Sequence, residues 1–93
     1  MAQRKSRVTD DQVEEARNTR VSDVVGRYVP DMERNGHEWV ALCPFHQEKT
    51  PSFHAVDNKG FYHCFGCGAN GDVIDFVQEW RRCSFVDAVL EIT

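Results

Sequence analysis

The chain has no long hydrophobic run, and no apolar segment approaches the roughly 20 residues that a bilayer-spanning helix needs. Its basic first residues are not followed by an apolar stretch, so we expect no secretory signal and assign the protein to the cytoplasm. Internal repeats, low-complexity tracts and long linkers are also missing. The sequence therefore predicts a basic tail over residues 1–8 and one folded domain over residues 9–93.

Positive charge is in deficit, because 11 Lys and Arg residues face 15 Asp and Glu residues, for a formal net charge of −4. Proteins that bind nucleic acids without sequence preference usually carry an excess of Lys and Arg to neutralise phosphates. The balance excludes a general polyanion binder and leaves room for local contacts. Hydrophobic residues, at 41%, are frequent enough to exclude an intrinsically disordered chain.

A chain of 93 residues has little apolar core with which to stabilise a fold. Folding at this length buries roughly 60–65% of the unfolded chain's surface, while ordering costs roughly 1.5 kcal/mol per residue. We therefore expect a further stabilising element. The four cysteines are the candidates, since cytoplasmic cysteines more often bind metals or carry out redox chemistry than form disulfides.

Two short helices are predicted near the N-terminus. Thr9 and Gln12 form a capping-box pattern at the start of the first helix. Ser22 is the expected N-cap of the second helix, which we predict to end near Val29 because Pro30 cannot continue the helical hydrogen bonds. The middle of the chain reads as β-structure, with strands expected over residues 38–42, 52–56 and 60–64 and a turn over 57–60.

Two more helices are predicted at the C-terminal end. Behind Asp72, apolar residues recur at the spacing of one helix face: Val73, Phe76, Val77 and Trp80. Ser84 and Asp87 form another capping pattern, before a helix predicted to reach Thr93. We assign Asp72 to the N-cap and Asp75 to the first turn rather than to a catalytic metal pair, and expect no catalytic residues in this segment.

The strongest chemical signal is a pair of metal-ligand motifs. Cys43 and His46 form one pair, Cys64 and Cys67 form the other, and each pair has two intervening residues at the end of a predicted strand. This is the spacing of a zinc ribbon, and three thiolates with one imidazole make a closed structural zinc site with no position for a catalytic water. The sequence predicts an α+β fold: a small antiparallel zinc-ribbon sheet with flanking short helices and one structural Zn.

Several alternatives to this site remain open from spacing alone. Cys64 and Cys67 match the spacing of a redox pair, although no βαβ pattern precedes them. An iron–sulfur cluster uses the same thiolates. His63 neighbours Cys64 and is an alternative fourth ligand. Cys83, between the last two predicted helices, is expected to be a spectator thiol.

The segment Cys43–Phe53, together with Phe61–Gly68 and the Gly71-Asp72 pair, resembles the N-terminal zinc-binding domain of bacterial and phage DnaG-type DNA primases. The resemblance covers nearly all of the chain after the basic tail. It implies a zinc ribbon with helices packed beside it, ligated through Cys43, His46, Cys64 and Cys67. It also implies a role in selecting the initiation site on single-stranded template DNA for an RNA polymerase domain.

The resemblance also implies where the template is contacted. Lys49, in the segment Glu48–Phe53, is the first expected DNA contact, and Lys59, Phe61 and His63 resemble a basic and aromatic sheet surface on which unpaired bases stack. Arg34 is a further candidate cation. The structural alternatives are that the cations are merely solvated and that Phe61, like Phe53, belongs to the ribbon's core.

A complete primase also carries a metal-dependent polymerase domain and a helicase-interacting region, and 93 residues leave no room for either. The expected partners are therefore single-stranded template, a primase RNA polymerase domain in the same or another chain, and a replicative helicase, with no membrane. The competing hypothesis is a zinc-ribbon module that docks onto another protein and does not contact DNA.

Overall fold

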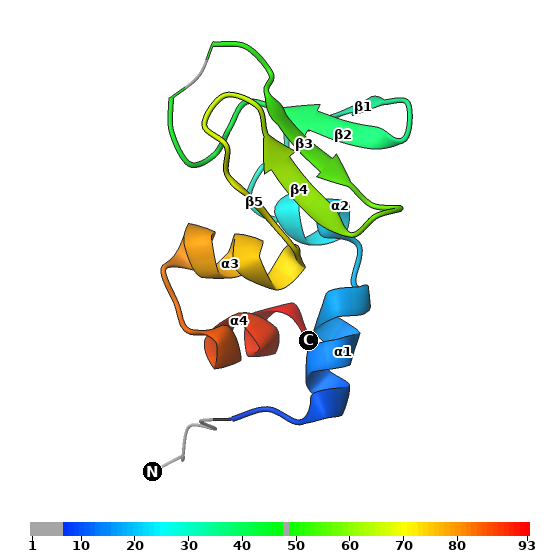
Figure 1. The fold of residues 1–93 in the computed structure, drawn as a ribbon, viewed down its shortest axis with the longest axis vertical. Helices are drawn as coiled ribbons and strands as arrows, with labels where there is room; N and C mark the ends of the chain where they lie inside the picture. Colours follow the sequence, from blue (N-terminus) through cyan, green and yellow to red (C-terminus); the bar gives the residue numbers. More distant parts are fainter. Residues whose placement is uncertain (1–6, 48) are drawn as a thin grey trace.

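A five-stranded sheet and a set of short helices make up the structure, a computed structural model that describes residues 7–47 and 49–93. In chain order the elements are α1 (Asp10–Asn18), α2 (Val21–Val25), β1 (Glu33–Asn35), β2 (Glu38–Ala41), β3 (Phe53–Val56), β4 (Phe61–Cys64), β5 (Asn70–Gly71), α3 (Val73–Arg81) and α4 (Phe85–Ile92). The sheet occupies one end of the molecule and α1, α3 and α4 the other, with α2 between them (Figure 1). The predicted α+β class is confirmed.

The strands follow each other across the sheet in sequence order, and every neighbouring pair is antiparallel. The three predicted strands are confirmed as β2, β3 and β4, each one residue shorter than expected. Strands β1 and β5 were not predicted. They have three and two residues, which is too short for an alternating pattern to be visible in the sequence.

Aromatic rings join the sheet to helix α3. Phe53 is stacked on Tyr62 with ring centroids 5.5 Å apart, and Phe76 of α3 meets the Tyr62 ring edge-on at 5.5 Å. Phe45, from the loop after β2, lies 5.4 Å from Phe76. Phe53 is fully buried, whereas Phe61 is 38% exposed, so Phe53 belongs to the core and Phe61 does not.

Three of the four predicted helix starts are confirmed. Thr9 and Gln12 form the expected capping box at α1, and Ser84 caps α4. Asp72 accepts from the N–H of Asp75 at 2.8 Å, while the Asp75 carboxylate accepts from the N–H of Asp72 at 2.9 Å. Both carboxylates are therefore used in capping α3, as their sequence positions indicated.

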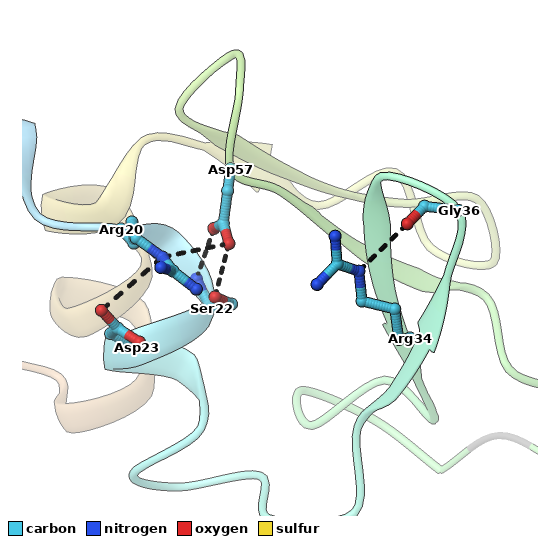
Figure 2. Close-up of polar contacts among 6 residues, drawn as sticks. All are labelled: Arg20, Ser22, Asp23, Arg34, Gly36 and Asp57. Carbon is cyan, nitrogen blue, oxygen red and sulfur yellow. Dashed lines mark hydrogen bonds and ion pairs between the residues drawn. The ribbon is translucent and has the colours of Figure 1, made fainter.

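The predicted N-cap role of Ser22 is wrong. Helix α2 begins at Val21, and its N-cap position is Arg20, whose side chain makes no capping hydrogen bond. The backbone N–H of Ser22 instead donates to Asp57 Oδ1 at 2.8 Å, and its hydroxyl donates to Asp57 Oδ2 at 2.5 Å (Figure 2). An acceptor 35 positions along the chain thus replaces the local cap, which a local pattern cannot reveal.

Helix α2 also ends at Val25, four positions earlier than predicted. The N–H groups of Tyr28 and Val29 both donate to the carbonyl oxygen of Val25, at 3.0 and 2.8 Å, so the chain turns after the helix. The turn brings the Tyr28 hydroxyl to Glu91 of α4, at 3.2 Å.

None of the helices in the described part of the chain combines the length and apolar character that a membrane crossing requires.

Candidate metal centre and nucleic-acid surface

Three cysteine side chains converge where strands β2 and β4 end. Cys43 follows β2, Cys64 ends β4, and Cys67 lies in the turn after β4. Their sulfur atoms all lie within 4.8 Å of one another, and the sulfurs of Cys43 and Cys67 are 3.8 Å apart. A tetrahedral ion with Zn–S bonds of about 2.3 Å separates its sulfurs by about 3.8 Å, whereas a disulfide needs about 2.05 Å. The arrangement fits a tetrahedral metal site.

The chain forms a tight, hydrogen-bonded turn from Cys64 to Ala69, and this turn contains the ligand Cys67. The N–H of Gly68 donates to the Cys64 carbonyl at 2.8 Å, and the N–H of Cys64 donates to the Ala69 carbonyl at 2.8 Å. Gly68 has a φ of +81°, a left-handed conformation that favours glycine. The small residue therefore lets β4 reverse direction immediately after a ligand.

Electrostatics at the cluster favour a bound cation. Burial raises the pKa of the Cys43 thiol to about 12, and the neighbouring sulfurs of Cys64 and Cys67 add to the shift. Burial also acts to raise the pKa of Cys64, but hydrogen bonds from the backbone N–H groups of Cys67 and Gly66 outweigh it, so that pKa lies below its ordinary value. A dication that binds all three sulfurs removes the cost of placing several thiolates together.

The two histidines considered as fourth ligand differ in position. His46 lies in the same loop as Cys43 and is exposed, and among the described residues it is not a member of the sulfur cluster. Its ligand role stays a prediction. His63 alternates with Cys64 along β4, and successive strand residues point to opposite faces. The ring of His63 lies 4.5 Å from that of Phe65.

Four aromatic side chains gather on the outer side of strands β3 and β4; we call this set the aromatic face: His54, Phe61, His63 and Phe65. His54 and His63 are direct cross-strand partners, and the Phe65 ring meets their rings edge-on with centroids 4.9 and 4.5 Å away. Phe61 is two positions before His63 on the same strand, so their predicted shared face is confirmed. Phe65 is 72% exposed, an unusual position for a phenyl ring.

Neither Phe65 nor His54 was predicted from the sequence as a site residue. The sequence did contain a sign of the role of Phe65: a large apolar residue lies between two metal ligands, Cys64 and Cys67. The two ligands fix the path of the backbone in this turn. His54 is half-buried, and its Nδ1 lies 2.7 Å from Glu38 Oε1. The carboxylate thereby fixes the orientation of a ring that supports Phe65.

The three candidate cations are not equally close to the aromatic face. Lys59 is exposed in the turn that leads into Phe61, and Lys49 is exposed in the loop between β2 and β3. Arg34 is in register with Trp39, which belongs to the opposite sheet face, and its guanidinium lies 5.6 Å from the Trp39 ring. Its Nε donates to the Gly36 carbonyl at 3.0 Å (Figure 2). By register Arg34 lies on the Trp39 face of the sheet, and of the aromatic face it meets only His54, with which it lines a surface hollow beside β1 and β2.

Cys83 lies between α3 and α4 and is separate from the sulfur cluster of the described residues. Its thiol is half-buried and lies 3.9 Å from the Val77 carbonyl oxygen. Burial raises the pKa of Cys83, with a contribution from the carboxylate of Asp87. A thiol with a raised pKa is a poor nucleophile at neutral pH, which agrees with a spectator role.

Comparison with known proteins gives consistent matches. The family model described as CHC2 zinc finger matches residues 7–93. A DNA primase of Lactococcus lactis is 51% identical over 72 residues, which is 77% of this chain and 11% of the relative. A DNA primase of Enterococcus faecalis is 40% identical over 87 residues, or 92% of this chain and 14% of the relative.

A solved structure gives the same picture for the fold. The crystal structure of the Aquifex aeolicus primase, described as zinc-binding and RNA polymerase domains, matches with a TM-score of 0.79 and 36% identity over 87% of this chain and 20% of that one. The chain thus spans a small part of the relatives it matches. The sulfur geometry and these matches show that the metal is a structural zinc, not an iron–sulfur cluster or a redox pair.

Proposed function

Because the chain belongs to the CHC2 zinc-finger family and is a zinc-binding domain of the DNA primase type, we propose that it recognises single-stranded template DNA and helps to select the start site for RNA primer synthesis in DNA replication. The observation that carries the proposal is the aromatic face beside the zinc site. Unpaired bases expose their ring faces, and exposed aromatic side chains on a small sheet offer a stacking surface for them.

The magnitude of stacking sets the expected affinity. Stacking contributes roughly 1–3 kcal/mol per base, so two or three bases give the isolated domain a Kd in the millimolar to micromolar range. The net charge of −4 indicates few phosphate contacts, so the salt dependence should be smaller than that of a basic protein that binds nucleic acids without sequence preference. Weak binding is sufficient when an attached polymerase domain raises the effective concentration of the template.

The zinc has a positioning role in this proposal. We assign its ligands to Cys43, His46, Cys64 and Cys67, a closed set that leaves no position for a catalytic water. The ion joins the loop after β2 to the turn after β4, and that turn carries Phe65. Zinc binding therefore orders the exposed ring together with the fold.

The remaining steps of primer synthesis are assigned to partners. The Aquifex aeolicus structure contains zinc-binding and RNA polymerase domains in one protein, which supports a primase RNA polymerase domain as the partner here, in the same chain or another. A replicative helicase in the cytoplasm is the further partner that this role implies. The domain itself acts in recognition, and the polymerase domain carries out catalysis.

Fluorescence anisotropy with the zinc-loaded chain tests the proposal. Labelled single-stranded oligonucleotides of different sequence should bind with different affinities. Duplex DNA should bind more weakly than any of the single strands for which binding is detected. Lys49→Ala should abolish measurable binding, because Lys49 is the expected cation for a template phosphate or base edge near the zinc site. Arg82→Gln, at the exposed end of α3, is the matched control and should bind normally.

A protein-docking module is the second candidate function, favoured by exposed apolar side chains at Leu42 and Phe85 in addition to Phe65. It predicts no binding to any oligonucleotide at high protein concentration. An unchanged titration for Lys49→Ala alone removes that residue from the site without removing the aromatic face.

A further inference from the structure

Three cations from separate parts of the sequence surround one surface hollow near the β3–β4 turn. Arg17 belongs to α1, Arg20 precedes α2, and Lys59 lies in the turn itself; all three are exposed. We call this set the basic hollow. Its lining is completed by Asn18, Thr19, Asp57, Gly60 and Asp72. The lining holds three cations and two carboxylates, and a third carboxylate, Asp23, faces Arg20 at 3.8 Å from outside the lining.

The two carboxylates in the hollow are already used by helix ends. Asp72 caps α3, and Asp57 accepts two hydrogen bonds from Ser22. Their ion pairs with the arginines are long, at 3.6 Å from Arg17 Nε to Asp72 Oδ2 and 3.6 Å from Arg20 Nε to Asp57 Oδ2. Exposed pairs of this kind contribute little to stability, and guanidinium groups bind phosphate through two parallel N–H donors. A phosphate can therefore join these arginines at little cost.

The hollow is held in place by the fold. Asp57 ties the β3–β4 turn to α2 through Ser22, and the Arg20 guanidinium lies beside the same carboxylate (Figure 2). The N–H of Gly60 closes the turn on the Val56 carbonyl at 2.8 Å, with Gly60 at a φ of +73°. The backbone positions of Lys59 and Arg20 are therefore fixed relative to each other before any ligand binds, which lowers the entropic cost of binding.

The hollow and the aromatic face both reach the β3–β4 turn. Lys59 lies in the turn, and Phe61 begins β4 directly after it. We propose that the basic hollow binds backbone phosphates of the same single strand whose bases stack on the aromatic face, so that the strand runs from Phe61 past Lys59 to Arg20 and Arg17. This inference rests on the proposed function and adds a second contact surface to it.

Salt dependence separates the two surfaces. Each phosphate contact with a single strand contributes about 0.7 to the slope of log K against log salt. The triple variant Arg17→Gln, Arg20→Gln and Lys59→Gln should therefore reduce the slope by about 2. The single variants Arg17→Gln and Arg20→Gln should each reduce it by about 0.7, which keeps the test valid if the triple variant folds poorly.

The control is Arg82→Gln, because Arg82 lies at the opposite end of α3 from Asp72, about 15 Å along the helix at 1.5 Å per residue. Its slope should equal that of the wild type. Phe65→Ala should show the reverse pattern, with weaker binding at every salt concentration and an unchanged slope. Circular dichroism and zinc content confirm that each variant is folded.

The outcomes are distinct. Wild-type slopes in both arginine single variants and in the triple variant would overturn the basic hollow and leave the aromatic face intact. An abasic oligonucleotide, which keeps its phosphates, should bind more weakly than the parent strand with the same slope, and a lower slope would also contradict the hollow. Absence of binding by the wild-type chain to every single strand would overturn the proposed function, and the inference with it.

Discussion

At the scale of single residues, the most informative side chain is Phe65, which is apolar and largely exposed. Its ring is held edge-on by His54 and His63, and His54 is oriented in turn by Glu38. A ring supported in this way loses little conformational freedom when a base stacks on it. The residue lies inside the zinc turn, so the metal and the proposed stacking surface share one short segment.

Phe65→Ala should weaken binding to single-stranded DNA about 5- to 150-fold, the equivalent of roughly 1–3 kcal/mol per stacked base. Phe85→Ala is the matched control, since Phe85 is also an exposed phenyl ring but lies on α4, away from the aromatic face. Anisotropy titrations of both variants provide the measurement. Equal effects of the two substitutions would contradict the assignment of Phe65.

Tyr62 makes the stability sensitive to alkaline pH. Burial raises its pKa to about 12, and the carboxylates of Asp75 and Glu79 contribute in the same direction. An unfolded tyrosine ionises near pH 10, so the neutral ring stabilises the fold fully below about pH 10, and this contribution is lost as the pH rises toward 12. Thermal unfolding between pH 9 and 12, in wild type and Tyr62→Phe, checks this. The variant should lose less stability over that range, and an equal loss would contradict the cause.

At the scale of elements, the contact between α2 and the β3–β4 turn joins the helices to the sheet. The Asp57 carboxylate accepts both the N–H and the hydroxyl of the buried Ser22. Asp57→Ala leaves these donors without their acceptor, so the free energy of unfolding should fall by roughly 1–3 kcal/mol. Chemical denaturation provides the measurement.

Asp23→Ala is the control for that substitution. Asp23 also faces Arg20, at 3.8 Å, but it is well exposed and belongs to the same turn of chain. Exposed pairs are worth about 0–1 kcal/mol, so the control should change stability little. If Asp23→Ala were as destabilising as Asp57→Ala, the tertiary cap would not be the stabilising contact.

The sequence predicted some elements better than others. Elements whose stabilising contacts are close in sequence were predicted, whereas those that depend on distant residues were not. Helices α1, α3 and α4 begin at capping residues within three positions of their partners, so Thr9, Asp72 and Ser84 were recognisable. Helix α2 depends on Asp57, which is distant in sequence. Strands β1 and β5 are stabilised by pairing with β2 and β4 and carry no pattern of their own.

The same distinction applies to the candidate site. The cysteine spacing predicted the sulfur cluster because ligand pairs are local motifs. The aromatic face was half predicted: period-two alternation placed Phe61 and His63 together, while Phe65 lies beyond the strand. The pairing register of β1 with β2 places Arg34 opposite Trp39, on the other face of the sheet. The sequence of one strand does not reveal how it pairs with its neighbour.

At the scale of the whole molecule, zinc is expected to decide whether the domain folds. Structural zinc in small fingers supplies an apparent binding free energy of roughly 10–16 kcal/mol, comparable to the roughly 5–15 kcal/mol net stability of ordinary domains. Cys43 and Cys64 also belong to the continuous core, so loss of the ion disturbs the sheet and the helices together. Exhaustive chelation should abolish the folded circular dichroism spectrum, and re-addition of zinc should restore it. An unchanged spectrum after complete metal removal would contradict this role.

The central claim is that the aromatic face of the zinc-loaded domain contacts unpaired bases. Heteronuclear NMR of the labelled chain during titration with a single-stranded oligonucleotide tests it most directly. The predicted result is a set of concentration-dependent chemical-shift changes at His54, Phe61, His63 and Phe65, with smaller changes at the basic hollow. Duplex DNA should cause smaller changes than the single strand at the same four residues. Shifts confined to α3 and α4, or no shifts at saturating oligonucleotide, would contradict the account.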